Sequence, residues 1–512
     1  MASLRKIEAL RYHISVATFY VENFGCRANQ ADGAALEHQF EQRGLARAST
    51  ATQADFVLFN SCDVTAAANR DARAAIRRTR RQNPEAKIII TGCYAQRASK
   101  EIAALPGVSA VIGNSHKHQL ADLALREVPV RERVQPRLLA STAEPTSSGH
   151  GSTFVPVATL TENQAGRIEN RIFVSDIFAH TELLAAPVFE GTGAANERNR
   201  PNLKVQDGCD NRCSFCVIPF VRGQSRSLPP TEIFREVNAL VATGYREVVI
   251  SGINLGRWGR DLAVSRQPSA CSKTTELRFE DLIRAILEET SLEKLRISSV
   301  EPMDWTDDLI SLVARSPRIA KHAHVPLQSG SDAVLRRMHR KYRPWHYREK
   351  IEKLRAAMPT AAIGADVMVG FPGETAAEFE ETRRLIEELP FTYLHVFTYS
   401  ARPGTPAASM ANQVPAHTAR ERNRILRDIA AEKKLAFMHS FIGKTVEAIT
   451  LGTCGTGAAH PDLAQAKFTT ALTDNYQKLH LVGRYQPNEW LRANVQYVES
   501  GTLVGIVNRT TI

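Results

Sequence analysis

Residues 203–216 read LKVQDGCDNRCSFC and place three cysteines directly after a strand-like run. Their spacing is Cys209-x3-Cys213-x2-Cys216, and we call them the compact triplet. Thiolates this close together on one loop can each hold one corner of a cubane iron–sulfur cluster, which leaves the fourth iron open to a substrate. The alternative is a zinc site, for which no fourth ligand is obvious before His322. The spacing therefore predicts a cluster-binding loop at the end of a strand.

Strand-like and helix-like segments alternate on both sides of this loop. Upstream, over residues 14–125, apolar runs of strand length alternate with amphipathic stretches, which predicts an open parallel α/β sheet. Residues 201–436 repeat the alternation six times, which predicts a full or partial barrel of six βα units. The predicted barrel strands are Leu203–Gln206, Glu247–Ser251, Lys294–Val300, His322–Leu327, Ile363–Val369 and Thr392–Tyr399.

The remaining segments divide the chain into four regions. Residues 129–200 break the alternation and contain a stretch rich in Ser, Gly, Pro and Thr, so they are predicted to be a linker. A loop insertion is expected at 261–275. After a long charged helix, short runs rich in β-branched and aromatic residues predict a small all-β barrel. The predicted boundaries are 12–128, 129–200, 201–438 and 439–512.

Three further cysteines form a dispersed triplet. Cys26, Cys62 and Cys93 each follow one of the first three strand-like runs, in the contexts NFGC, FNSC and ITGC. Because the carboxyl ends of parallel strands meet at one edge of a sheet, we expect these three cysteines to lie together in space. The alternative is three unrelated core cysteines, since free cysteine is often buried.

Composition narrows the class of protein. The 512 residues carry 65 Lys and Arg against 54 Asp and Glu, a net charge of +11, and this excess favours a polyanionic partner such as nucleic acid. The sequence has no run of 18 apolar residues and no apolar N-terminal segment, so we expect a cytoplasmic protein without a membrane-spanning helix. In a reducing compartment, clustered cysteines more often bind metal than form disulfides.

Together these features resemble the radical S-adenosylmethionine methylthiotransferase family. The C-x3-C-x2-C run, with Phe215 before its last cysteine, is similar to the radical S-adenosylmethionine signature. The dispersed triplet and the β-rich tail extend the likeness over nearly the full chain. The segments GCRANQ, NSCDVT, TGCYAQ, HVPLQSGS and GADVMVGFPGE resemble the branch that acts on threonylcarbamoyladenosine in tRNA, the MtaB type. The isopentenyladenosine branch more often reads GCQMN at the first cysteine.

The resemblance implies a fold, cofactors and a reaction. The fold would be an α/β chain with a flavodoxin-like N-terminal domain, a partial (βα)6 barrel and a C-terminal TRAM domain that binds RNA. One 4Fe-4S cluster on the compact triplet, with S-adenosylmethionine, would generate a 5′-deoxyadenosyl radical, and a second on the dispersed triplet would carry the sulfur. The product would be a methylthio group at C2 of threonylcarbamoyladenosine at position 37, next to the anticodon. A monomer with an electron donor, such as a flavodoxin-like reductant, is expected, and no catalytic side chain beyond the cluster ligands.

Further residues are candidates for binding S-adenosylmethionine or RNA. The first group follows predicted barrel strands, where the active sites of such barrels lie, and consists of Ser251, Gly252, Glu301, Gln328 and Gly370. The second group comes from two arginine-rich clusters and a polar-aromatic loop of the tail, and consists of Arg77, Arg78, Arg337, Arg340, Tyr476 and Lys478. A solvated charged face or a simple hairpin turn is the alternative for this second group.

Other functions fit parts of the pattern. The same scaffold could modify isopentenyladenosine in tRNA or an aspartate of a ribosomal protein. A non-catalytic iron–sulfur protein that binds RNA is a third possibility, but it would need neither an open iron nor a second cluster. The two cysteine triplets therefore favour an enzyme.

Overall fold

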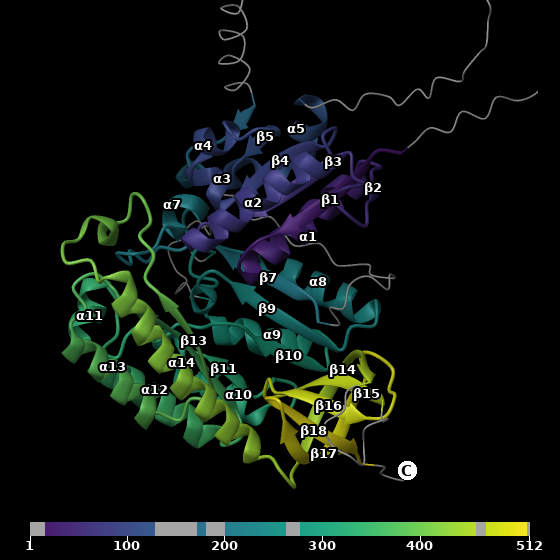
Figure 1. Cartoon of the computed structure of the whole chain (residues 1–512). Helices are drawn as coiled ribbons and strands as arrows, with labels where there is room; N and C mark the ends of the chain where they lie inside the picture. Colours follow the sequence, from purple (N-terminus) through teal and green to yellow (C-terminus); the bar gives the residue numbers. More distant parts are fainter. Residues whose placement is uncertain (1–15, 128–170, 181–199, 263–276, 457–466, 509–512) are drawn as a thin grey trace, which may run out of the picture. The chain divides into compact units, whose positions relative to one another are not determined.

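The chain forms two compact units. The computed structural model describes residues 16–127, 171–180, 200–262, 277–456 and 467–508 (Figure 1). The first unit takes in Met1–Phe24, Ala35–Cys62 and Ala67–Asp176, and the second takes in Gly25–Ala34, Asp63–Ala66 and Ile177–Ile512. None of the described helices has both the length and the apolar character that crossing a membrane requires.

A parallel sheet forms the centre of the first unit. Its strand order is β2-β1-β3-β4-β5-β6, and every neighbouring pair is parallel. The first five strands have the 2-1-3-4-5 order of flavodoxin-like folds, so the predicted open α/β sheet is confirmed. The strands are β1 (Thr18–Asn23), β2 (Ala46–Arg47), β3 (Phe56–Ser61), β4 (Lys87–Gly92), β5 (Val108–Ile112) and β6 (Ile172–Phe173).

Both faces of this sheet are buried. Alternate residues of β3 point to opposite sides, so Phe56 and Leu58 enter one apolar cluster while Val57 and Phe59 enter another. Burial on two faces explains why the central strands are continuous apolar runs rather than alternating ones. The helices of this part of the chain are α1 (Arg27–Gln42), α2 (Ala66–Gln82), α3 (Cys93–Arg97), α4 (Ser99–Ala103) and α5 (Leu120–Glu127).

A partial barrel of parallel strands forms the centre of the second unit. Its two sheets, β10-β9-β7-β8 and β11-β12-β13, are joined by parallel bridges from Leu295 to Ile319 and from Ser299 to His324. The predicted partial (βα)6 barrel is therefore confirmed, with the short antiparallel β8 (Arg226–Ser227) added beside β7. The six parallel strands are β7 (Asn202–Asp207), β9 (Glu247–Gly252), β10 (Lys294–Ile297), β11 (His322–His324), β12 (Ala362–Val369) and β13 (Tyr393–Thr398).

Helices alternate with these strands, and local sequence signals set where several of them begin. Thr306 accepts a hydrogen bond from the backbone N–H of Leu309 at 3.1 Å, and Thr375 forms a capping box with Glu378. The helices are α7 (Ile218–Arg222), α8 (Pro230–Ala242), α9 (Phe279–Glu289), α10 (Asp307–Arg315), α11 (Asp332–Arg337), α12 (Pro344–Ala357), α13 (Ala376–Glu388) and α14 (Ala416–His439).

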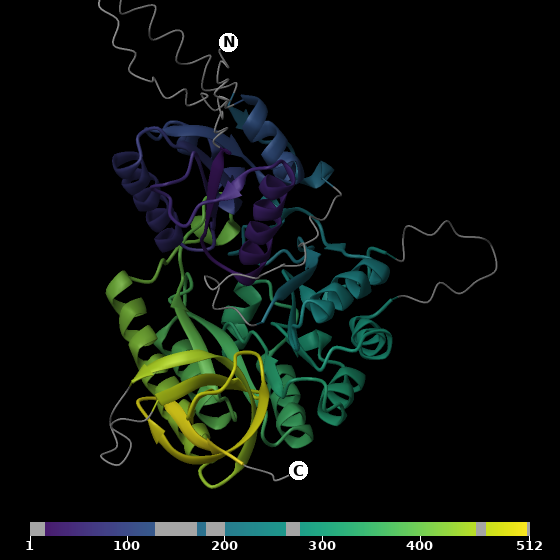
Figure 2. The same cartoon turned by 90° about the vertical axis from the view of Figure 1, so that its right-hand side faces the viewer.

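A closed five-stranded barrel follows α14 and confirms the predicted all-β tail (Figures 1 and 2). The loop between β15 and β16 contacts the partial barrel. Asn475 Nδ2 donates to the carbonyl of Thr360 at 2.9 Å, and Arg296 donates to the carbonyl of Asp474 at 2.9 Å. The strand order is β14-β15-β16-β18-β17, and the strands are β14 (Thr445–Thr456), β15 (Lys467–Thr473), β16 (Lys478–Val482), β17 (Trp490–Glu499) and β18 (Thr502–Val507).

Three strands were not predicted, namely β2, β6 and the short β8 already described. Strand β6 lies within the segment predicted to be a linker and pairs with β5, and β2 pairs with β1. Each has only two residues, which is too short to produce a periodic apolar pattern. The Ser- and Gly-rich part of the linker and residues 263–275 of the predicted insertion lie outside the described residues.

Candidate active site

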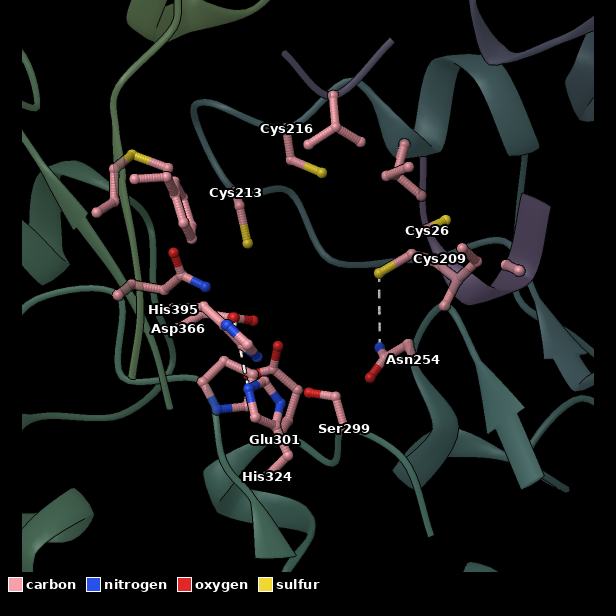
Figure 3. Close-up of a pocket in the computed structure, with 18 of the residues that line it drawn as sticks. Cys26, Cys209, Cys213, Cys216, Asn254, Ser299, Glu301, His324, Asp366 and His395 are labelled. Atoms are coloured by element: carbon pink, nitrogen blue, oxygen red, sulfur yellow. Dashed lines mark hydrogen bonds and ion pairs between the residues drawn. The ribbon is translucent and has the colours of Figure 1, made fainter. Parts of the chain in front are cut away.

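A cavity of about 580 Å³ lies in the second unit at the carboxyl ends of the barrel strands. All three cysteines of the compact triplet line it, together with Cys26 (Figure 3). The loop that carries the triplet leaves β7 through Gly208, whose φ is +71°. A Cβ atom at this position would collide with the carbonyl of Gln224, so the turn requires glycine. The compact triplet therefore occupies the predicted place at a strand end.

The thiols of the compact triplet point into the cavity and are held by polar neighbours (Figure 3). Cys209 Sγ accepts from Asn254 Nδ2 at 3.5 Å, and Cys213 Sγ accepts from Arg340 Nη1 at 3.3 Å. Burial raises the pKa of Cys209 to about 11 and that of Cys216 to about 12. Both are therefore thiols at neutral pH, and binding a metal group would release their protons.

The three thiols of the compact triplet are compatible with a cluster. Within the described part of the chain, no three His, Cys, Asp or Glu side chains come close enough together to hold one metal ion. Three sulfurs on a short loop around a cavity match the three-cysteine ligation of a 4Fe-4S cluster. The zinc alternative requires a tight tetrahedral set of ligands, and the described residues do not supply one.

Four of the five residues predicted to contact S-adenosylmethionine line the same cavity. They are Ser251, Gly252, Glu301 and Gln328. Gly370 instead lies in the turn after β12, where its φ is +75° and its N–H donates to Glu374 at 2.6 Å. A Cβ atom there would press against Ala419, so Gly370 is explained by packing.

The cavity wall contains buried polar atoms without hydrogen-bond partners. Among the described residues, Ser251 Oγ, Asn254 Oδ1 and Gln328 Oε1 have none. Gln328 is only 9% exposed and has a φ of +62°, a conformation unusual for a residue other than glycine. Because buried polar groups are normally satisfied, these atoms fit a polar ligand such as the amino-acid part of S-adenosylmethionine.

Arg340 lies inside the site rather than on a surface open to RNA. Its side chain is 6% exposed and donates to Glu301 as well as to Cys213. Burial raises the pKa of Glu301, although the adjacent guanidinium acts in the opposite direction. Arg337 donates to both carboxylate oxygens of Glu378 at 3.0 and 2.8 Å. The predicted contact of Arg340 with RNA phosphate is therefore not compatible with its buried position.

Tyr476 also lines the cavity. Its φ is +66°, and its hydroxyl accepts from Arg27 Nη2 at 3.1 Å. Its ring centroid lies 4.8 Å from that of His322. By contrast, Lys478 is exposed, as are Arg77 and Arg78 on α2. Of the predicted RNA-binding residues, only these three have exposed side chains.

Two members of the dispersed triplet lie at neighbouring strand ends of the first unit. Cys62 follows β3 and Cys93 follows β4, and Ser61 pairs with Gly92 in the parallel register. The side chains of Cys62 and Cys93 are buried, and Asn114 Nδ2 donates to Cys93 Sγ at 3.7 Å. Cys26 follows β1 but belongs to the second unit, so the meeting of all three cysteines stays a prediction.

A buried ionic network beside the site was not predicted from the sequence. Asp32 pairs with Lys204 and with Arg222, and Asp207 pairs with the same two cations at 2.9 Å each. Burial alone would raise the pKa of Asp207, but the charges of Arg222 and Lys204 outweigh it and lower the pKa. The network fixes the start of α1, which follows Cys26 directly, to the strand that leads into the compact triplet. The only sequence signal was charged Lys204 inside a strand expected to be buried.

Family models match the two parts of the chain that carry the triplets. The model described as "Uncharacterized protein family UPF0004" matches residues 18–113, and the model of the "Radical SAM superfamily" matches residues 203–386. The first range contains the dispersed triplet and the second contains the compact triplet.

Known proteins are similar over most of the chain. A threonylcarbamoyladenosine tRNA methylthiotransferase MtaB of Bacillus subtilis is 33% identical, over 96% of this chain and 97% of its own. A tRNA-2-methylthio-N(6)-dimethylallyladenosine synthase of Thermobifida fusca is 34% identical, over 84% of this chain and 77% of its own. The radical S-adenosylmethionine methyltransferase TsrM of Kitasatospora setae shares the fold, with a TM-score of 0.50 at 13% identity over 77% of each chain. The chain belongs to the radical S-adenosylmethionine methylthiotransferase family, as a member of the MtaB type.

Proposed function

We propose that this protein adds a methylthio group to C2 of N6-threonylcarbamoyladenosine at position 37 of tRNA, next to the anticodon. The observation that carries the proposal is a cavity of the second unit that the compact triplet and polar residues of the strand ends line together. The likeness to a threonylcarbamoyladenosine tRNA methylthiotransferase over nearly the whole chain supports this substrate.

The residues of the cavity fit a 4Fe-4S cluster and S-adenosylmethionine. Cys209, Cys213 and Cys216 would hold the cluster, and the unpartnered Ser251 and Gln328 would bind polar groups of S-adenosylmethionine. When bound, these cofactors supply a carbon radical that can remove hydrogen from an unactivated position. The chain itself orients the thiols, through hydrogen bonds such as those of Asn254 and Arg340, and encloses the reacting groups away from water.

We further infer a second 4Fe-4S cluster on Cys26, Cys62 and Cys93. Cys62 and Cys93 support this second cluster because they are buried at the adjacent ends of β3 and β4. Anaerobic reconstitution should give about eight iron and eight sulfide per chain, as two four-iron clusters require. A plateau near four in folded wild-type protein would contradict the second cluster.

The exposed basic residues are the candidates for tRNA contacts. Arg77, Arg78 and Lys478 are exposed, and Arg337 is partly exposed. Contacts to phosphate release counterions, so affinity should fall steeply as salt rises. A cytoplasmic monomer that receives electrons from a flavodoxin-like reductant completes the proposal.

Mass spectrometry of tRNA nucleosides tests the substrate directly. A strain without this protein should lack methylthiolated threonylcarbamoyladenosine, and expression of the protein should restore it. Loss of methylthiolated dimethylallyladenosine instead would assign the activity of the Thermobifida fusca relative. If the reconstituted protein cleaved no S-adenosylmethionine under strong reductant, a non-catalytic role in RNA binding would replace the proposal.

A further inference from the structure

Arg27 occupies a defined place in the wall of the cavity. It begins α1 directly after Cys26, and its backbone carbonyl accepts from Asn202 Nδ2 at 3.0 Å. The side chain lines the cavity, and Nη2 donates to the hydroxyl of Tyr476 at 3.1 Å. Asn202 of β7 therefore holds the backbone of Arg27, and Tyr476 of the C-terminal barrel holds its guanidinium.

The charge of Arg27 is not neutralised by a carboxylate. Two other arginines line the cavity, and each pairs with an acid: Arg340 with Glu301, and Arg402 with Asp63 at 3.6 Å. Among the described residues, no Asp or Glu lies within ion-pair distance of Arg27. Its hydrogen bond to Tyr476 uses one of the five N–H donors of a guanidinium, which leaves others for a ligand.

Aromatic side chains lie beside Arg27 in the cavity wall. The rings of His322 and Tyr393 are parallel within 5° at a centroid distance of 5.9 Å, and the ring of Tyr476 lies against both. Burial lowers the pKa of His322 well below its ordinary value and also lowers that of His395, and the charge of Arg27 acts in the same direction. Both histidines are therefore neutral at pH 7.

His324 and Asp366 face the cluster loop from the same wall of the cavity. His324 and Asp366 lie 3.4 Å apart, and in Figure 3 they lie with His395 across the cavity from Cys213 and Cys216. Arg296, behind the aromatic rings, is already paired with Glu247 at 2.6 Å. Arg27 is thus a cation of this aromatic wall that has no acidic partner of its own among the described residues. Its charge is available to a ligand in the cavity.

The two nucleosides named for the relatives differ in the charge of their N6 substituent. A threonylcarbamoyl group ends in a carboxylate, whereas a dimethylallyl group is a hydrocarbon. We propose that Arg27 binds the carboxylate of the threonylcarbamoyl group and thereby selects this nucleoside. This inference rests on the proposed function. A guanidinium matches a carboxylate in both charge and geometry, and desolvation within a cavity strengthens such a pair.

Binding measurements that combine Arg27 variants with ligands that have or lack the carboxylate test this contact. The reconstituted full-length protein is titrated with synthetic anticodon stem–loops that carry threonylcarbamoyladenosine or its methyl ester, which has no carboxylate. Wild-type protein should bind the acid about 10- to 150-fold more tightly than the ester, the range for a hydrogen bond to a charged group. Arg27→Gln should bind both equally weakly, and Arg27→Lys should recover part of the preference.

Two further variants control for the loss of a positive charge and for the orientation of Arg27. Arg235, on α8, is an exposed arginine outside the cavity, so Arg235→Gln should keep the wild-type preference. Tyr476→Phe, which removes only the hydroxyl that orients Arg27, should reduce the preference severalfold. Iron content and circular dichroism confirm that each variant is loaded and folded.

Two results would overturn the assignment of Arg27. One is an acid-to-ester preference in Arg27→Gln equal to that of the wild type. The other is a wild-type protein that does not distinguish acid from ester, a measurement that needs no variant at all. Both leave the proposed function intact if the wild type still methylthiolates threonylcarbamoyladenosine in tRNA. Failure of that reaction, with intact binding of the acid, would overturn the proposed function instead.

Discussion

The two cysteine triplets are placed by different levels of structure. The compact triplet lies within eight consecutive residues of one loop, so its geometry follows from local spacing and from the turn at Gly208. The dispersed triplet spans residues 26–93 and depends on the order and register of three neighbouring strands, β1, β3 and β4. The compact triplet should therefore tolerate changes elsewhere in the fold. The dispersed triplet should come together only when the whole N-terminal sheet is folded.

The largest expected effect comes from breaking the compact triplet. Cys213→Ala should abolish reductive cleavage of S-adenosylmethionine, because alanine removes one of the three thiolates that would hold the cluster. The measurement is 5′-deoxyadenosine formed anaerobically under strong reductant. Cys454→Ala, which changes a cysteine outside both triplets, is the matched control and should retain wild-type cleavage. Cleavage by Cys213→Ala at the wild-type rate would contradict the assignment of this triplet.

Removing one cysteine of the dispersed triplet should separate the cleavage of S-adenosylmethionine from the transfer of the methylthio group. Cys62→Ala should still yield 5′-deoxyadenosine, because Cys62 belongs to the first unit and the compact triplet to the second. It should form no methylthiolated nucleoside, since the proposed sulfur-bearing site has lost a ligand. Both products are measured in the same reaction. Methylthiolated nucleoside at wild-type yield would show that the dispersed triplet does not supply the sulfur.

The positions of the cysteines after strands were predictable from the sequence, but the contacts around them were not. Each of the six cysteines follows a strand whose apolar run is strong enough to recognise, so strand ends and cysteines could be aligned. The hydrogen bond between Arg27 and Tyr476 joins residues 449 positions apart, and that between Lys204 and Asp32 joins residues 172 apart. No periodicity encodes such pairs, and the sequence around Tyr476 by itself predicts only an RNA-binding loop. Only the packing of the C-terminal barrel against β11 brings it to the cavity.

A substitution in the buried network of Asp32, Lys204, Asp207 and Arg222 tests whether the ion pairs at the start of α1 stabilise the second unit. Asp32→Asn leaves Lys204 and Arg222 with Asp207 as their remaining carboxylate, and unpairing a buried charge costs about 3–5 kcal/mol. All four tryptophans lie in the second unit, so the urea midpoint of tryptophan fluorescence reports its unfolding. Asp307→Asn is the control, because its side chain is 72% exposed and an exposed pair is worth less than about 1 kcal/mol. Equal shifts for the two variants would contradict a structural role for the network.

The smallest expected effect concerns one asparagine beside each triplet. Asn254 donates to Cys209 Sγ and Asn114 donates to Cys93 Sγ. A donor to a ligand sulfur stabilises the more negative, reduced form of a cluster, so each Asn→Ala change should lower the reduction potential of its own cluster. A hydrogen bond of about 1 kcal/mol corresponds to about 40 mV for one electron. Asn254→Ala is titrated in the Cys62→Ala background and Asn114→Ala in the Cys213→Ala background, so that electron paramagnetic resonance detects one cluster at a time. If the second cluster lies on the dispersed triplet, Asn114→Ala lowers the potential of the cluster that remains in the Cys213→Ala background, whereas an unchanged potential would place that cluster away from Cys93.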